Sequence, residues 1–228
     1  MSTLVVVAVG VRIVAANFWW NDTRTDPDLY VALAHQLANC TGFCTPGTAV
    51  PTAYRPPGYP LVLATLINAP PPLCDLAVPF WNLLFDVATI GFVAYWLRSW
   101  SPNRWGSIVA VGLLAVDPLM VRYIALPMTE ACFTCWSTAA VLLLMTAMDW
   151  NVSTRSGLER FAWGLAGFLI GFAALCRPSI WPFIGLISVS LLARHWWTAA
   201  LRQSRKQRLV ELCVFWLTVA ITVSPWVV

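Results

Sequence analysis

Charged side chains are scarce in this chain of 228 residues, and their scarcity excludes most soluble folds. Asp, Glu, Lys and Arg make up 11% of the sequence, whereas hydrophobic residues make up 59%. Soluble domains carry about 25% charged residues. The net charge of +4 is too small to indicate a nucleic-acid partner. The composition is that of a protein that lies in a membrane and contacts its lipids.

Histidine is also scarce, and cysteine shows no metal-ligand spacing. We expect His35 on an external helix and His195 on the cytoplasmic side, so the two histidines cannot share a site. Cys132 and Cys135 form a CxxC pair inside an apolar run without a second pair, which favours packing over metal binding. The sequence predicts no set of metal ligands and does not identify a cofactor. Carboxylates expected on the external side are nevertheless compatible with binding of a divalent cation.

The chain contains instead several apolar runs of roughly 17–22 residues, the length that crosses a bilayer as a helix. The predicted spans are 4–20, 76–97, 105–121, 131–148, 161–176, 180–193 and 209–228. The first is not typical of a cleavable signal peptide, because Arg12 interrupts its apolar core. The predicted fold class is all-α: a bundle of about seven transmembrane helices, in a single membrane domain covering residues 1–228.

Lys and Arg are distributed unequally between the two sides of this bundle. With a cytoplasmic N-terminus, nine of them fall in inner connections, and only Arg24, Arg55, Arg122 and Arg177 fall outside. This asymmetry follows the positive-inside rule. It predicts a multi-pass protein of the cell membrane whose residues 21–74 form an external loop. The expected external carboxylates are Asp22, Asp26, Asp28, Asp75, Asp117 and Glu130.

The external loop is patterned and is more than a tether. Apolar residues within 28–39 share one helical face, which predicts a helix in the plane of the interface. Asp26 would cap this helix, with Pro27 at its first position. A second apolar segment, 59–68, is too short to span the bilayer and is also expected to lie along the interface.

Two charges lie within apolar runs, Arg12 in the first and Asp86 in the second. Because an unpaired charge is costly there, we predict an ion pair between neighbouring helices, which Asn82 could complete from one turn away. A proton relay is the alternative. Close helix packing is predicted for the fifth run from three glycines, Gly164, Gly167 and Gly171.

The order of motifs on the external face resembles a known family. A D-x-x-x-Y-x-x-L-A pattern starts at Asp26 and includes Tyr30, and RPPGYPL follows at 55–61. PMTE at 127–130, Arg177 with Pro178, and SPW at 224–226 come later. This set is similar to the C superfamily of polyprenol-phosphate-sugar-dependent glycosyltransferases. The closest likeness is to the bacterial branch related to protein O-mannosyltransferases and lipid A aminoarabinose transferases.

The resemblance covers essentially the whole chain and implies a function. Family members continue past the SPW motif, so it predicts that the chain is the N-terminal portion of such an enzyme. The implied reaction moves a sugar from a polyprenyl-phosphate donor to a hydroxyl of a lipid, glycan or protein acceptor. It assigns the catalytic carboxylate to Asp26, whose alternative role is a helix cap. Asp28 is the competing catalytic candidate. Glu130 is the second acid, or an acid favoured at a helix N-terminus.

Cations and tyrosines complete the implied site. Arg55 and Arg177 suit the donor phosphate, because a planar guanidinium meets two phosphate oxygens at once. Arg177 can instead extend to the outer interface. Tyr30 and Tyr54 are candidate substrate-binding residues, although Tyr54, like Tyr59, can instead anchor the loop at the interface.

A small transporter or an accessory membrane subunit remains the alternative function. Either would also show apolar spans and the positive-inside asymmetry. Transport sites lie near the bilayer midplane, whereas the acids of this chain are expected at the outer interface.

Overall fold

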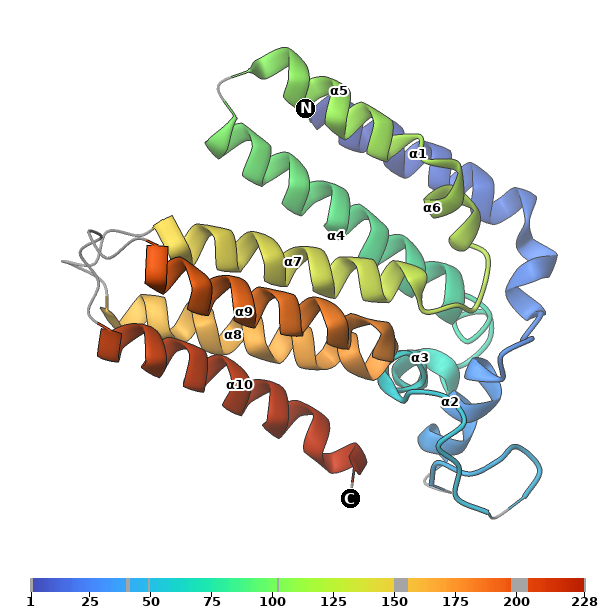
Figure 1. The fold of residues 1–228 in the computed structure, drawn as a ribbon. Helices are drawn as coiled ribbons and strands as arrows, with labels where there is room; N and C mark the ends of the chain where they lie inside the picture. The colour runs from blue at the N-terminus through green and yellow to red at the C-terminus, as the bar shows by residue number, and fades with distance from the viewer. Residues whose placement is uncertain are drawn as a thin grey trace. The chain divides into compact units, whose positions relative to one another are not determined.

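The computed structural model describes residues 2–39, 42–48, 50–101, 103–149, 156–197 and 205–227, and every regular element within them is a helix (Figure 1). The all-helical prediction is confirmed for these residues. Four segments are long and apolar enough to cross a membrane: Ala77–Trp100, Arg104–Tyr123, Glu130–Met148 and Leu209–Trp226. Three other predicted spans contain shorter apolar helices, so the count of about seven stays a prediction.

The chain forms two compact units, Met1–Thr138 (the N unit) and Ala139–Val228 (the C unit). The N unit contains α1 (Ser2–Phe18), η1 (Trp20–Arg24), α2 (Tyr30–Ala38), α3 (Gly58–Ile67), α4 (Ala77–Trp100), α5 (Arg104–Ala115), α6 (Pro118–Tyr123) and the start of α7 (Glu130–Asp149). The C unit contains the rest of α7, α8 (Ser156–Cys176), η2 (Pro178–Ile180), α9 (Trp181–Trp197) and α10 (Arg205–Val227).

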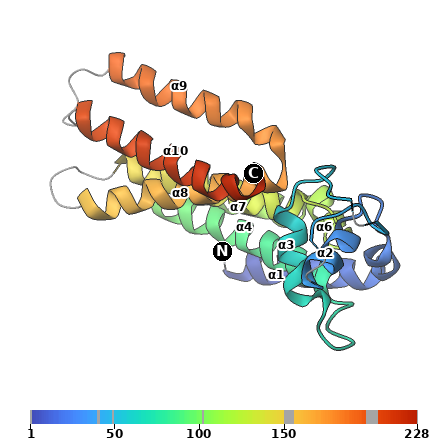
Figure 2. The same cartoon turned by 90° about the horizontal axis from the view of Figure 1, so that it is seen from below.

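In the N unit, α1, α4 and α5 pack along one another. Their shared apolar core consists of Ala8, Ile90, Ala94, Val111 and Ala115. The short helices α2 and α3 pack together at the end of this unit opposite the N-terminus (Figures 1 and 2). We call this the α2–α3 end. The predicted loop helices therefore both exist.

Helix α2 begins later than predicted. Asp26, Pro27 and Asp28 occupy a turn closed by a hydrogen bond from the Leu29 N–H to the Asp26 carbonyl, 3.2 Å long. Leu29 is the N-cap and has φ 62° and ψ 21°, a left-handed conformation unusual for a residue with a side chain. The prediction of Pro27 as the first helical residue is wrong, because Pro27 lies in the turn.

The predicted span 105–121 consists of two helices, because the chain breaks at Asp117. Pro118 has no N–H to donate to a carbonyl of the preceding turn. The Asp117 side chain then caps α6, accepting hydrogen bonds from the backbone N–H groups of Leu119 at 2.9 Å and Met120 at 3.0 Å. Apolar composition alone does not reveal this break.

In the C unit, α8 and α10 lie side by side (Figures 1 and 2). A Cβ atom added at Gly167 would lie 2.0 Å from the Thr218 Oγ1, and one added at Gly171 would lie 2.7 Å from the Thr222 Cβ. At Gly164 the nearest atom would be 3.5 Å away, an ordinary contact. Close packing is therefore confirmed, and Gly167 and Gly171 are the positions at which it leaves no room for a larger side chain.

Candidate functional site

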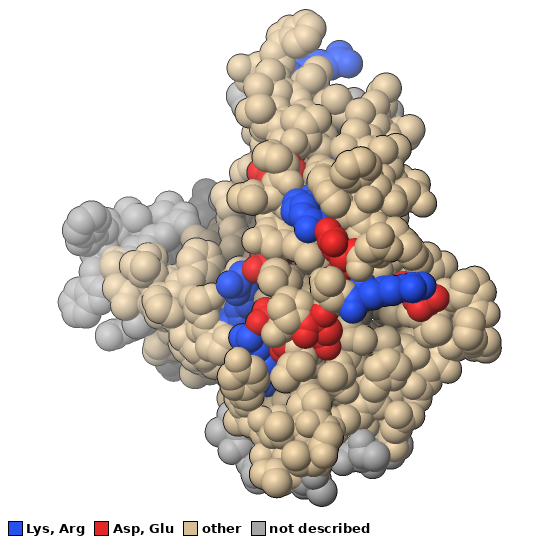
Figure 3. Space-filling view, turned by 90° about the vertical axis from the view of Figure 1, so that its right-hand side faces the viewer, with Lys and Arg blue, Asp and Glu red and all other residues tan. Residues whose placement is uncertain are grey.

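Charged side chains gather at the α2–α3 end of the N unit. Figure 3 faces this end and shows carboxylates beside basic side chains on a surface that is otherwise mostly uncharged. Three ion pairs belong to it: Arg55 with Asp28, Arg122 with Asp22 at 2.7 Å, and Arg24 with Asp75 at 3.7 Å. Arginine thus neutralises most of the acids of the loop.

Asp26 differs from these acids, because it has no ion pair among the described residues. Its Oδ2 accepts a hydrogen bond from the Ala32 N–H in the first turn of α2 at 2.9 Å, although Leu29, and not Asp26 as predicted, is the N-cap residue. Its Oδ1 is shielded from solvent and has no hydrogen-bond partner in the described part of the chain. A buried acceptor without a partner costs about 1–3 kcal/mol, which makes a catalytic role or a bound group a natural explanation.

A buried tyrosine of α3 lies near both predicted catalytic acids. Burial raises the pKa of Tyr59 well above its ordinary value, and the negative charges of Asp26 and Glu130 raise it further. Both carboxylates are therefore near enough to this one phenol for their charges to act on it, although they are far apart in the sequence. Glu130 is the first residue of α7, as the PMTE motif predicted.

A second buried tyrosine, Tyr30, lies between Tyr59 and Arg55. Its ring centroid lies 5.6 Å from that of Tyr59, in an edge-to-face arrangement. Burial raises the pKa of Tyr30; Arg55 opposes the shift, and Glu130 adds to it. A side-chain hydrogen bond also joins Tyr30 to Thr129, the residue before α7. Of the predicted site residues, Asp28, Arg55 and Glu130 thus act on the Tyr30 phenol, and Asp26 and Glu130 act on the Tyr59 phenol.

Arg55 is held in place by three neighbours. Its terminal nitrogen pairs with Asp28, and its guanidinium carbon lies 4.6 Å from the ring centroid of Tyr54 and 5.7 Å from that of Tyr30. The Nε atom is buried without a hydrogen-bond partner among the described residues. The sequence reasoning did not anticipate the pair with Asp28, although opposite charges in one loop were a signal for it.

The remaining predicted residues lie in different surroundings. Tyr54 is 69% exposed and stacks on Arg55, whereas Tyr59 is fully buried and cannot contact a sugar. Arg177 belongs to the C unit, where its N–H bonds to the Ala173 carbonyl at 2.9 Å just before η2. Its role toward a donor phosphate stays a prediction.

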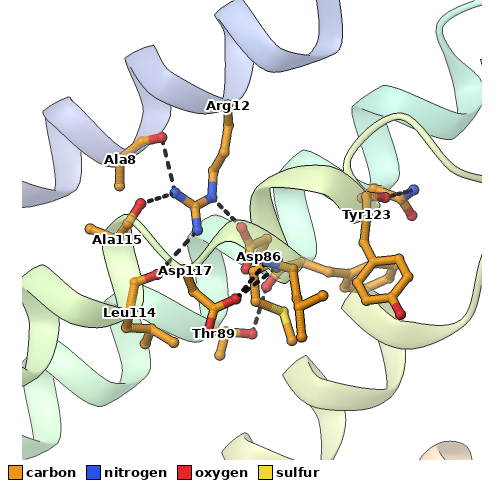
Figure 4. A network of polar contacts seen from close by, with 12 residues as sticks. Ala8, Arg12, Asp86, Thr89, Leu114, Ala115, Asp117 and Tyr123 are labelled. Atoms are coloured by element: carbon orange, nitrogen blue, oxygen red, sulfur yellow. Dashed lines mark hydrogen bonds and ion pairs between the residues drawn. The ribbon is translucent and has the colours of Figure 1, made fainter. Parts of the chain in front are cut away.

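The predicted ion pair inside the apolar helices is confirmed. Arg12 of α1 donates to Asp86 of α4, and the two side chains are 0% and 1% exposed (Figure 4). Arg12 also donates to the carbonyl oxygens of Ala8, Leu114 and Ala115, at 3.2, 3.3 and 2.6 Å. A charge with so many partners is part of the packing of α1, α4 and α5.

Asn82 does not complete this pair, and that expectation is wrong. Its amide accepts a hydrogen bond from the Tyr59 hydroxyl at 2.9 Å and donates to the carbonyls of Tyr123 and Leu126. Although Asn82 is one helical turn from Asp86, its side chain reaches α3 and the end of α6.

Comparisons with protein-family models, with curated proteins and with solved structures find no match. In the described ranges, no three His, Cys, Asp or Glu side chains are grouped closely enough to hold a metal ion. The geometry of the α2–α3 end and the motif resemblance are therefore the basis for a functional proposal.

Proposed function

We propose that the protein is a membrane glycosyltransferase that moves a sugar from a polyprenyl-phosphate donor to an acceptor hydroxyl. The observation that carries the proposal is the Asp26 carboxylate, whose Oδ1 is shielded from solvent and has no partner among the described residues. A fixed arginine, Arg55, and a second acid, Glu130, belong to the same neighbourhood. A base, a cation for phosphate and a second polar group are what this reaction requires.

In the proposed reaction, Asp26 is the general base. The oxygen of the acceptor hydroxyl forms a bond to the anomeric carbon of the sugar. The bond between that carbon and the phosphate oxygen breaks, and polyprenyl phosphate leaves with the electron pair. The proton of the acceptor hydroxyl passes to the Asp26 Oδ1. General base catalysis of this kind contributes about 100- to 10,000-fold to a rate.

Arg55 is proposed to stabilise the departing phosphate. Its guanidinium is already oriented by Asp28 and by the rings of Tyr54 and Tyr30, so little side-chain freedom is lost when an anion binds. Asp28 then serves as the partner of Arg55 and is a weaker candidate for the base. We assign Glu130 to the sugar, because a carboxylate can accept hydrogen bonds from sugar hydroxyl groups.

The membrane location of the proposed reaction follows from the donor. A polyprenyl chain stays in the bilayer, and its phosphate lies at the interface, where short helices such as α2 and α3 can meet it. Four long apolar helices support a membrane protein. The external position of the α2–α3 end is inferred from the positive-inside asymmetry. The acceptor is a lipid, glycan or protein hydroxyl reached from that side.

A transporter is less well supported by the charges of the N unit. Among its described residues, Arg12 and Asp86 are the charges buried within apolar helices, and they bind each other and backbone carbonyls. Such a satisfied pair has little capacity to take up and release a substrate.

The proposal is tested by reconstituting the full gene product in proteoliposomes. A panel of labelled polyprenyl-phosphate hexoses, pentoses and amino sugars is supplied with a membrane extract as acceptor, and labelled product and released polyprenyl phosphate are measured. Wild-type protein should use at least one donor. Failure of folded wild-type protein to use any polyprenyl-phosphate sugar would contradict the proposal.

A further inference from the structure

The six-residue helix α6 begins at Pro118 and is followed by Pro127, and one buried amide, that of Asn82, binds the backbone at its C-terminal end. Pro127 has no N–H with which to continue the helix from the Tyr123 carbonyl. The Asn82 Nδ2 donates to the Tyr123 oxygen at 2.9 Å and to the Leu126 oxygen at 2.7 Å. The same two oxygens also accept backbone N–H bonds within the segment, at 3.4 and 2.8 Å. Asn82 is 0% exposed, and its two bonds to these carbonyls are partly shielded from solvent.

The same amide connects this segment to α3. The Tyr59 hydroxyl donates to the Asn82 Oδ1 at 2.9 Å, and Tyr59 packs edge-to-face against Tyr30 of α2. Asn82 therefore joins the α2–α3 pair to residues 123–129, the segment that leads into Glu130. Both the donors and the acceptor of the amide are in use, so neither an aspartate nor a leucine of similar size can reproduce its bonds.

We propose that Asn82 is a positioning residue, which holds residues 123–129 against α3 and so keeps Glu130 near Asp26. It acts through the backbone of that segment and through Tyr59, without contacting substrate. Its kinetic consequence depends on the proposed glycosyl transfer, whereas its effect on residues 123–129 does not.

The first measurement is hydrogen–deuterium exchange on the full-length protein in nanodiscs. Asn82→Asp keeps the size of the side chain and removes both donors to the carbonyls. Backbone amides of residues 123–133 should exchange about 10-fold faster, because the Tyr123 and Leu126 carbonyls each lose the donor that ties this segment to α4. Thr89→Val is the matched control. Thr89 is also buried on α4, but its hydroxyl bonds to the Phe85 carbonyl of its own helix at 2.8 Å, so exchange in 123–133 should not change.

A milder variant serves as the test if the Asn82→Asp protein does not fold and accumulate in membranes. Tyr59→Phe removes one hydroxyl and leaves the donors of Asn82 in place. It should raise exchange in 58–67 and in 123–133, by less than Asn82→Asp. Unchanged exchange in 123–133 in the Asn82 variant, or in Tyr59→Phe when that is the variant that folds, would overturn the proposal.

The second measurement separates positioning from general stability. In the transfer assay, Asn82→Asp should lower kcat by about 10-fold while the KM for the donor stays within about 2-fold, because Arg55 is held by Asp28 and not by Asn82. Faster exchange with an unchanged kcat would overturn the positioning role. If wild-type protein transfers no sugar, the proposed function fails, and the exchange experiment still decides whether Asn82 holds the segment before Glu130.

Discussion

The guanidinium of Arg12 occupies the place of the N–H donor that Pro118 lacks. In an unbroken helix the Leu114 carbonyl would accept the N–H of residue 118, and the Ala115 carbonyl that of Leu119. Residue 118 is a proline, and the Leu119 N–H is bonded to the Asp117 side chain. Arg12 donates to both of these carbonyls. The break between α5 and α6 and the buried charge in α1 are therefore parts of one arrangement.

Removing either charge of the buried pair should destabilise the N unit. Arg12→Leu or Asp86→Asn leaves the other group without its partner, a change that typically costs about 3–5 kcal/mol. Exchanging the charges, Arg12→Asp with Asp86→Arg, should restore only part of the loss, because an aspartate at position 12 cannot donate to the carbonyls of Leu114 and Ala115. Yield in membranes and the Tm in detergent measure this. Normal yield and Tm in both single variants would contradict it.

Much of the fold follows from the sequence, since each predicted span contains a helix of the described chain. Length and hydropathy locate helices well. They do not reveal that a single residue, such as Asp117, ends one helix and caps the next, so the predicted span 105–121 does not show the break. The pairing of Arg12 with Asp86 was predictable because unpaired charges in apolar surroundings are so costly. The hydrogen-bond partners of Asn82 were not predictable, because side chains one helical turn apart on α4 can face different neighbouring helices.

The candidate site shows the same limit. The motifs point to Asp26, Tyr30, Arg55 and Glu130; in the fold, the charges of Arg55 and Glu130 act on Tyr30, and those of Asp26 and Glu130 act on Tyr59. The pairing of Arg55 with Asp28 joins two residues 27 positions apart, a contact that local sequence does not specify. Only this tertiary contact distinguishes the two neighbouring aspartates, one paired and one with an unused oxygen.

The glycines of α8 should differ in their tolerance of alanine. Gly167→Ala places a Cβ 2.4 Å from the Phe215 carbonyl oxygen, so α8 and α10 must separate. Gly164→Ala meets nothing closer than 3.5 Å and should be neutral or slightly stabilising. Gly185→Ala in α9, with no atom within 4 Å, is the control. Thermal unfolding in detergent should show a lower Tm for Gly167→Ala alone. Equal Tm values for all three variants would show that the two helices do not pack this closely.

Val50, in the predicted external loop, and Lys206, at the start of α10, should label from opposite sides of the membrane. Cys44 is buried and is a poor probe, whereas Val50 in the same loop is 63% exposed. In a variant without other cysteines, Val50→Cys should react with a membrane-impermeant thiol reagent added to intact cells, and Lys206→Cys should react only after permeabilisation. The reverse pattern would invert the topology inferred from the positive-inside rule.

Asp26 and Asp28 should fail in different ways when each is changed to asparagine. In Asp26→Asn the amide oxygen still accepts the hydrogen bond from Ala32, so α2 keeps its cap and the protein should fold and insert normally. The amide cannot take the acceptor proton, and kcat should fall by about 100- to 10,000-fold. Asp28→Asn removes the charge that orients Arg55, and it should mainly raise the KM for the polyprenyl-phosphate donor. The measurement is the initial rate of sugar transfer in proteoliposomes over a range of donor concentrations, at equal amounts of folded protein. A near-normal kcat for Asp26→Asn, together with a large loss of kcat for Asp28→Asn, would show that Asp26 only bonds the start of α2 and that Asp28 is the general base.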